Sequence, residues 1–247
     1  MADEARHRPH SDPTTDAPAL TGEAERFWEQ RYRDQAPRWS GRPNPVLVDV
    51  AGPLHPGRAL DLGCGEGGDA LWLAGRGWLV TAVDIAQSSV DRVRAWAERD
   101  RLADRVRTER HNLAHSLPTG EFDLVSAQYL HTPFELDRAQ VLRAAAHLLV
   151  PGGLLLVVDH GSVAPWSWHQ DAHFATPAEK FAELALDPDG WHAERLDAPQ
   201  RTATGPDGQT ATVTDHVLAV RRSLGQEKLG QEKRSGLNTS ASTTSTL

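Results

Sequence analysis

The sequence has little cysteine and no long apolar run, and each shortage excludes a class of protein. A single cysteine in 247 residues excludes an intramolecular disulfide framework and fits a reducing compartment. No stretch approaches the roughly 20 consecutive apolar residues of a membrane-spanning helix. Residues 1–16 carry acids, histidines and prolines where a signal peptide needs an apolar centre. We therefore expect a cytoplasmic protein with no membrane partner.

Positive charge is also scarce. The chain has 26 Lys and Arg against 34 Asp and Glu, a formal net charge of −8, and no basic run. This balance argues against an electrostatic surface for DNA or RNA. We expect a small-molecule partner, while the oligomeric state has no signal in the sequence.

The polar ends of the chain bound the expected domain. Hydrophobic residues make up 39% of the sequence, enough for one sizeable core. Residues 1–20 are charged and proline-bearing, and residues 223–247 contain a tandem LGQEK repeat and a Ser/Thr-rich end. Both ends are predicted to be disordered. One domain is therefore expected over residues 21–222.

The most informative segment is a strand followed by a glycine-rich loop. The apolar run 58–62 reads as a buried strand, and a helix is predicted shortly after the loop. Glycines let the backbone turn tightly and approach a ligand, and the first-turn amides of the helix point at the same place. We expect Gly63, Cys64, Gly65 and Gly67 to contact a bound nucleotide.

The loop alone leaves the nucleotide ambiguous, because Gly63, Gly65 and Gly68 also fit the dinucleotide pattern G-x-G-x-x-G. Asp61 at the mouth of the loop favours another ligand. A carboxylate there repels a pyrophosphate but attracts a cation. S-adenosylmethionine carries both an ammonium and a sulfonium. A dinucleotide oxidoreductase stays open as an alternative.

A second acid follows the next predicted strand, residues 79–84. Asp84 stands at the strand's end with Ile85 beside it, where an acid can accept both ribose hydroxyls of an adenosine. Dehydrogenases and methyltransferases share this feature. It therefore supports an adenosine ligand and does not choose between the two classes.

Together, the D-x-G-x-G-x-G segment at 61–67 and the V-x-x-V-D segment at 80–84 resemble the first two motifs of class I S-adenosylmethionine-dependent methyltransferases. The segments 27–32 and 39–44 are similar to the branch that includes the tellurite-resistance and thiopurine methyltransferases. The resemblance covers residues 25–221. It implies methyl transfer from S-adenosylmethionine to a small-molecule acceptor, with a soft nucleophile (a thiol or chalcogen) as one candidate.

The expected fold is a Rossmann-like, doubly wound α/β fold with a seven-stranded, mostly parallel sheet. Strands are predicted at 58–62, 79–84, 106–110, 121–131 with its exit loop, 154–160, 191–198 and 212–221. The turn signal at 204–208 joins the last two as an antiparallel hairpin. Thr132 and Pro133 are predicted to start a helix, and Ser88 or Ser89 to cap another.

The resemblance also implies further donor contacts. An N-terminal lid, residues 21–45, would bring Trp39 and Arg42 near the methionine end. Asn112 replaces the family's usual acid at the adenine amine, and Leu113 would pack on the ring.

The same aromatics allow a plainer interpretation. Trp28, Tyr32 and Trp39 also fit as core residues that anchor an N-terminal helix, and for Trp28 core packing is favoured. Gln128 follows the fourth strand at the ligand end of the sheet and is expected to contact the cofactor.

The sulfonium is already an activated electrophile, so holding the acceptor in line is the expected catalytic contribution. A hydroxyl or amine acceptor would gain from a general base, and His131 and His160, which each follow a strand at the ligand end, are the candidates. His169 and His173 are four residues apart, but no second cluster completes a site, so no metal is expected. A donor-binding sensor or scaffold without catalysis is a further alternative.

Overall fold

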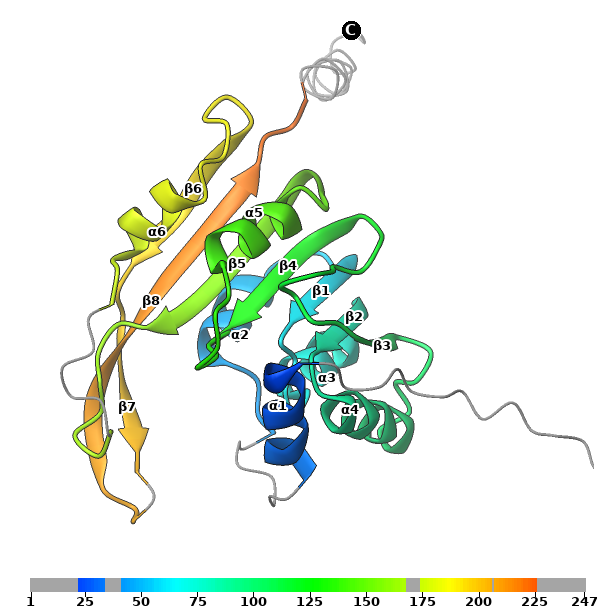
Figure 1. Cartoon of the computed structure of the whole chain (residues 1–247). Coiled ribbons are helices and arrows are strands. Elements are labelled where there is room, and N and C mark those ends of the chain that lie inside the picture. The colour runs from blue at the N-terminus through cyan, green and yellow to red at the C-terminus, as the bar shows by residue number, and fades with distance from the viewer. Residues whose placement is uncertain (1–21, 34–40, 168–173, 206, 226–247) are drawn as a thin grey trace, which may run out of the picture.

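The computed structural model describes residues 22–33, 41–167, 174–205 and 207–225, which form a twisted sheet with flanking helices (Figure 1). The helices are α1 (Glu23–Arg33), α2 (Pro45–Ala51), α3 (Gly68–Gly75), α4 (Gln87–Arg99), α5 (Arg138–Ala146) and α6 (Pro177–Glu183). The strands are β1 (Arg58–Leu62), β2 (Leu79–Asp84), β3 (Val106–Arg110), β4 (Phe122–Gln128), β5 (Leu149–His160), β6 (Trp191–Asp197), β7 (Gln200–Thr204) and β8 (Thr210–Arg222). The predicted leader 1–20 and most of the predicted tail 223–247 lie outside the described residues.

The strand order is β3-β2-β1-β4-β5-β8-β6, with β7 paired to β8. β1 to β5 pair in parallel, and β8 runs antiparallel to β5. The order reverses direction between β1 and β4, which in open α/β sheets opens a ligand crevice at the carboxyl ends of the strands. The Rossmann-like, mostly parallel fold with a late antiparallel strand is confirmed.

An eighth strand corrects the predicted C-terminal hairpin. The turn at 204–208 joins β7 to β8, whereas β6 pairs with the later half of β8, from Val217 to Arg222. Pro199 separates β6 from β7 because it lacks the N–H that a continuous ladder would need. β8 is 13 residues long, enough to pair with two successive partners.

The predicted helix start at Thr132 and Pro133 is wrong. α5 begins at Arg138, and the Asp137 side chain caps it by accepting from the Gln140 amide at 2.9 Å. The Thr132 hydroxyl instead accepts a hydrogen bond from the Trp28 indole N–H at 3.2 Å. The segment after β4 therefore stays an irregular loop, as the ligand end of the sheet requires.

The predicted serine cap of α4 is also wrong. Ser89 is buried and donates its hydroxyl to the Gly65 carbonyl. No side chain of the residue before the helix caps it, and the amide of Ser88 is satisfied by the Glu29 carboxylate of α1. A side chain distant in sequence has taken the role that a local serine was expected to fill.

Two apolar layers hold the helices on the sheet. α2, α3 and α4 pack on one face, where the side chains of Leu47, Leu73 and Val93 are fully buried. α5 and α6 pack on the other face around Phe122 and Leu142. Among the described residues, no helix combines the length and apolar character needed to cross a bilayer.

Candidate active site

A single cavity of about 1080 Å³ lies at the carboxyl ends of β1, β2 and β4. Its walls come from the glycine loop, α1, the segment 41–45, the loop after β4, and β7. Pockets that hold one small ligand usually measure about 300–1,000 Å³. This cavity is therefore large enough for a donor and an acceptor together.

Most of the residues predicted to contact the cofactor line this cavity. They are Arg42, Asp61, Gly63, Cys64, Gly65, Asp84, Ile85, Asn112, Leu113 and Gln128. Gly67 is not part of the lining, and Trp39 lies outside the described residues, as do His169 and His173. Of the two candidate bases, His131 lines the cavity and His160 does not.

The glycine loop is shaped by three left-handed residues. Gly63, Gly65 and Gly67 have φ values of 71°, 51° and 77°. A Cβ on Gly65 would lie 3.2 Å from the Tyr32 hydroxyl, so this glycine keeps α1 close to the loop. A Cβ on Gly67 would lie 2.7 Å from the Val93 side chain. The glycine at 67 thus serves packing against α4, which explains why it faces away from the cavity.

Three carboxylates line the cavity beside the glycine loop: Asp61 and Asp84, which are buried, and Asp69, which is partly buried. Burial, followed by repulsion from Asp69 and Asp84, raises the pKa of Asp61 well above its ordinary value. Burial likewise raises the pKa of Asp69 to about 6 and outweighs the hydrogen bond from the Asn44 amide. A ligand that brings positive charge would stabilise all three in their ionised form.

Two buried oxygen atoms in the cavity wall have no hydrogen-bond partner among the described residues. They are Oδ2 of Asp61 and Oε1 of Gln128. The two residues lie on neighbouring strands, because Asp61 pairs in register with Ser126, two positions before Gln128. Unpaired buried acceptors are costly. A positively charged group with several N–H donors, such as the ammonium of S-adenosylmethionine, fits this pair.

Asp84 is held in a fixed orientation at the end of β2. Its two oxygens accept from the amides of Gly65 and Ala86, each at 3.0 Å. Burial raises its pKa, against the hydrogen bonds from these amides. An ionised carboxylate has about four lone-pair sites. The lone pairs that remain can accept from the two ribose hydroxyls, as the sequence predicts for Asp84.

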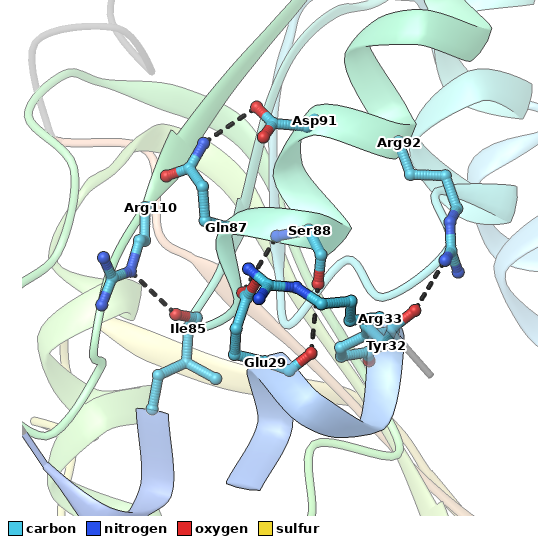
Figure 2. A network of polar contacts seen from close by, with 9 residues as sticks. All are labelled: Glu29, Tyr32, Arg33, Ile85, Gln87, Ser88, Asp91, Arg92 and Arg110. Carbon is cyan, nitrogen blue, oxygen red and sulfur yellow. Dashed lines mark hydrogen bonds and ion pairs between the residues drawn. The ribbon is translucent and has the colours of Figure 1, made fainter. Parts of the chain in front are cut away.

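Helix α1 is attached to α4 through polar contacts, which Figure 2 shows from close by. The Glu29 carboxylate accepts from the Ser88 amide at 3.0 Å, at the start of α4. The Arg92 guanidinium donates to the Tyr32 carbonyl at 2.7 Å and to Glu66 at 3.1 Å. These contacts hold α1 as one wall of the cavity.

The segment after α1 also rests on the loop. A Cβ on Gly68 would lie 2.7 Å from the Arg42 carbonyl oxygen. The Asn44 amide donates to Asp69 Oδ1 at 2.6 Å. The backbone of 41–44 therefore passes so close to the start of α3 that position 68 has no room for a side chain.

The other end of the cavity is built from the loop after β4. Tyr129 opens this loop with a φ of 50°, a conformation rare for a non-glycine residue and commonest at functional sites. Aromatic and apolar side chains follow around the mouth: Trp28, Leu130, Phe134 and Leu136. Trp28 belongs to the cavity wall, which corrects the prediction that it packs in the core.

His131 lies in this loop with its Nε2 3.3 Å from Asp159 Oδ1. Asp159 is buried and also pairs with Arg138 and Lys180, each at 2.7 Å. Burial, reinforced by Arg138 and opposed by Asp159, lowers the pKa of His131 to about 4. The imidazole is therefore neutral near pH 7. His160 stacks on Tyr129 with ring centroids 4.5 Å apart, behind the cavity wall.

Sequence reasoning missed Arg201 and Thr202, which β7 brings to the cavity. No local signal marked them, because β7 itself was not predicted. Asp69 was also missed as a site residue, although its position in the first turn after the glycine loop was a usable signal.

Comparisons with known proteins place these features in a family. A family model described as "Methyltransferase domain" matches residues 59–153. Ubiquinone biosynthesis O-methyltransferase from Thiobacillus denitrificans is 30% identical over 184 residues, 64% of this chain and 78% of that protein. Methyltransferase GfsG from Streptomyces halstedii is 35% identical over 107 residues, 41% of this chain and only 37% of that protein. Ribosomal RNA small subunit methyltransferase C from Alcanivorax borkumensis is 31% identical, with 36% of its length covered.

Solved structures share the fold at lower identity. A structure described under "Conversion of a Disulfide Bond into a Thioacetal Group during Echinomycin Biosynthesis" has a TM-score of 0.61 and 24% identity, covering 86% of this chain and 99% of that one. TehB from Haemophilus influenzae has a TM-score of 0.59 and 17% identity, covering 81% and 67%. These similarities show the shared fold over most of the chain, and they do not identify an acceptor.

Proposed function

The chain belongs to the class I S-adenosylmethionine-dependent methyltransferases, and we propose that it methylates a small molecule bound at the aromatic end of its cavity. One observation carries the proposal: one continuous, partly open cavity joins the acidic end at Asp61 to the mouth at Trp28 and His131. The net charge of −8 supports a small acceptor over a nucleic acid. One relative is named as an O-methyltransferase of ubiquinone biosynthesis, and that name describes an enzyme with a small-molecule acceptor.

The donor supplies an activated methyl group when bound. The chain's own residues then have three tasks: Asp61 and Gln128 hold the charged end, Asp84 the ribose, and Ile85, Asn112 and Leu113 the adenine. The Asn112 amide nitrogen donates to Glu25 of α1, and its oxygen accepts from the Ala114 amide. One lone pair of that oxygen is left for the adenine amine.

We further propose that the acceptor is a soft nucleophile, a thiol or chalcogen, as in the tellurite-resistance and thiopurine branch. A base with a pKa of about 4, as His131 has, removes a proton weakly at pH 7. An acceptor that is already ionised near neutral pH needs no such help. His131 then orients the nucleophile by a hydrogen bond, and His160 supports Tyr129 behind it.

The test uses purified full-length protein, labelled donor, and matched aromatic thiols, phenols and amines. We expect transfer to thiols to be fastest, and His131→Ala to lower kcat for a thiol by less than about tenfold, since no proton transfer is lost. A phenol that reacts faster, and only with His131 intact, would reverse the choice of acceptor.

Two other functions are outcomes of the same experiment. Tight donor binding without turnover of any acceptor would indicate a sensor or scaffold. Calorimetry that detects NADH binding and no binding of S-adenosylmethionine would indicate an oxidoreductase.

A further inference from the structure

β7 delivers a cation to the cavity that no family motif predicted. Arg201 lines the cavity, and the hairpin that carries it extends past the end of β5, because β8 pairs with β5 only from Asp215 onward (Figure 1). Its side chain is 35% exposed, so it reaches solvent-accessible space. The strand therefore adds a cation to a mouth that also holds aromatic and apolar side chains, His131 and Glu135.

The Arg201 guanidinium is held in a defined orientation. Its Nε donates to Asp215 Oδ2 at 2.6 Å, and its Nη2 donates to the Tyr129 hydroxyl at 3.2 Å. Asp215 is 2% exposed, and its other oxygen, Oδ1, has no hydrogen-bond partner among the described residues. A guanidinium has five N–H donors. These two contacts leave further donors, and within the described residues Nη1 has no hydrogen-bond partner.

Tyr129 supports this arrangement at a cost in backbone strain. Its φ of 50° turns the chain sharply at the end of β4, and its amide still donates to the Val158 carbonyl at 2.7 Å. The ring stacks on His160 and lies below the Arg201 guanidinium, 5.9 Å from the ring centroid. Strain of this kind persists where the surrounding contacts maintain it, usually at a ligand site.

The two ends of the cavity differ in charge. The donor end has Asp61, Asp69 and Asp84. Around the acceptor end, Asp159 is shared by two cations, Arg138 and Lys180, while Asp215 balances Arg201. With His131 neutral, these five groups leave one positive charge, which Glu135 in the same loop and lining offsets, so the acceptor end is close to neutral whereas the donor end is acidic.

Building on the proposed function, we propose that Arg201 binds a carboxylate on the methyl acceptor, so that the substrate is an aromatic or apolar acid. A carboxylate matches the planar fork of a guanidinium better than a neutral amide does. Its apolar body would pack on Trp28 and Phe134, with the nucleophilic atom directed toward the donor end.

The experiment compares acids with their amides. The acceptors are 3-mercaptobenzoate and 3-mercaptobenzamide, with the 3-hydroxy and 3-amino pairs alongside, all assayed with labelled S-adenosylmethionine. Binding of 3-phenylpropionate and 3-phenylpropanamide to the protein saturated with S-adenosylhomocysteine is measured by calorimetry. In the wild-type protein we expect KM or Kd to be at least about tenfold lower for the acid.

The variants separate recognition from structure. Arg201→Gln alone leaves Asp215 buried without its cation and can destabilise the fold, so the main variant is Arg201→Gln with Asp215→Asn, which removes both charges. We expect its amide-to-acid ratio of KM or Kd to fall from at least about ten to about one, with S-adenosylhomocysteine affinity unchanged. Arg201→Lys should retain part of the preference. Arg99→Gln, at an exposed position that pairs with Asp100, is the control for loss of a surface cation.

An equal response to acids and amides in the wild type, or a preference that survives in the double variant, would overturn the carboxylate site while methyl transfer stands. Failure to bind S-adenosylmethionine would instead overturn the proposed function, and this inference with it. If the donor binds but no thiol, phenol or amine is methylated, the phenylpropionate titration decides: absence of carboxylate-dependent binding rejects the site.

Discussion

Asp61 is a residue whose burial is unfavourable to the ligand-free fold and favourable to binding. It is 2% exposed, and its Oδ2 lacks a partner among the described residues. We expect Asp61→Asn to weaken S-adenosylmethionine binding about 10- to 100-fold, the usual effect of losing a hydrogen bond to a charged group. The same change should raise the free energy of unfolding of the ligand-free protein at pH 7, because a buried charge is removed. Calorimetry and urea denaturation measure the two effects, and effects of the same sign would contradict this account.

The neighbouring carboxylates make donor binding pH-dependent. Burial raises the pKa of Asp69 to about 6 and raises that of Asp84, above the values near 4 of an unfolded chain. The folded, ligand-free protein thus holds these protons more tightly, so this contribution to stability decreases as the pH rises from 4 through 6. A bound cation has the opposite effect, because it favours the ionised forms of Asp69 and Asp84.

We therefore expect S-adenosylmethionine affinity to rise between pH 5 and pH 7, with protons released on binding. Calorimetry in two buffers of different ionisation enthalpy counts the protons. Asp69→Asn should flatten the profile around pH 6. A profile that is flat in the wild type, or proton uptake on binding, would show that these groups do not face the donor's charge.

At the scale of elements, α3 contains a matched pair of glycines that tests the lid contact. In Gly68→Ala the new Cβ would lie 2.7 Å from the Arg42 carbonyl oxygen, whereas Gly75, in the last turn, has nothing within 4 Å of its Cβ position. We expect Gly68→Ala to displace the segment 41–44 and weaken donor binding about tenfold, roughly 1.4 kcal/mol. Gly75→Ala should stabilise the helix by about 0.5–1 kcal/mol and leave binding unchanged. Equal donor affinities in the two variants would show that the segment 41–44 does not contribute to donor binding.

One of the polar contacts between α1 and α4 is a carboxylate that acts as a helix cap from outside the helix. Because Glu29 satisfies the Ser88 amide, Glu29→Ala should cost about 1 kcal/mol of stability, as loss of an N-cap does. Hydrogen exchange in α1 should rise, and donor dissociation should become faster. Arg33→Ala removes only the exposed partner of Glu29, so its cost should stay below about 0.5 kcal/mol. Unchanged exchange in Glu29→Ala would show that α1 is held by its other contacts, among them the hydrogen bond from Arg92 to the Tyr32 carbonyl.

These elements also show what local sequence can and cannot predict. The strand, glycine loop and acids at Asp61 and Asp84 were predictable because a few adjacent residues dictate each of them. Thr132 and Pro133 have the composition of a helix start, yet Trp28, 104 positions away, binds the threonine hydroxyl. The cap of α4 was likewise supplied by Glu29 from a distant helix. Local patterns fail where a long-range side chain competes for the same hydrogen bond.

At the scale of the whole molecule, the doubly wound sheet was predictable. The way in which β8 pairs with β6 along one part and with β7 along the other was not. Alternating strands and helices are typical of a doubly wound sheet. Whether one long strand pairs with one neighbour or two depends on Pro199 and on the register of β8, which periodicity does not encode. That single ambiguity hid β7, and with it Arg201, the residue on which acceptor recognition is proposed to depend.

The domain itself should function without the last residues of the chain. Ser223 donates its amide to the Gly190 carbonyl at 2.8 Å, and Leu224 lies against Gly152, so a truncation should come after Gly225. We expect removal of residues 226–247 to change the free energy of unfolding by less than about 0.5 kcal/mol, with donor affinity and turnover unchanged. Thermal denaturation, calorimetry and the labelled-donor assay on both lengths test this. If donor binding survives truncation but a cellular function is lost, a sensor or scaffold acting through the tail gains support over methyl transfer as the protein's main role.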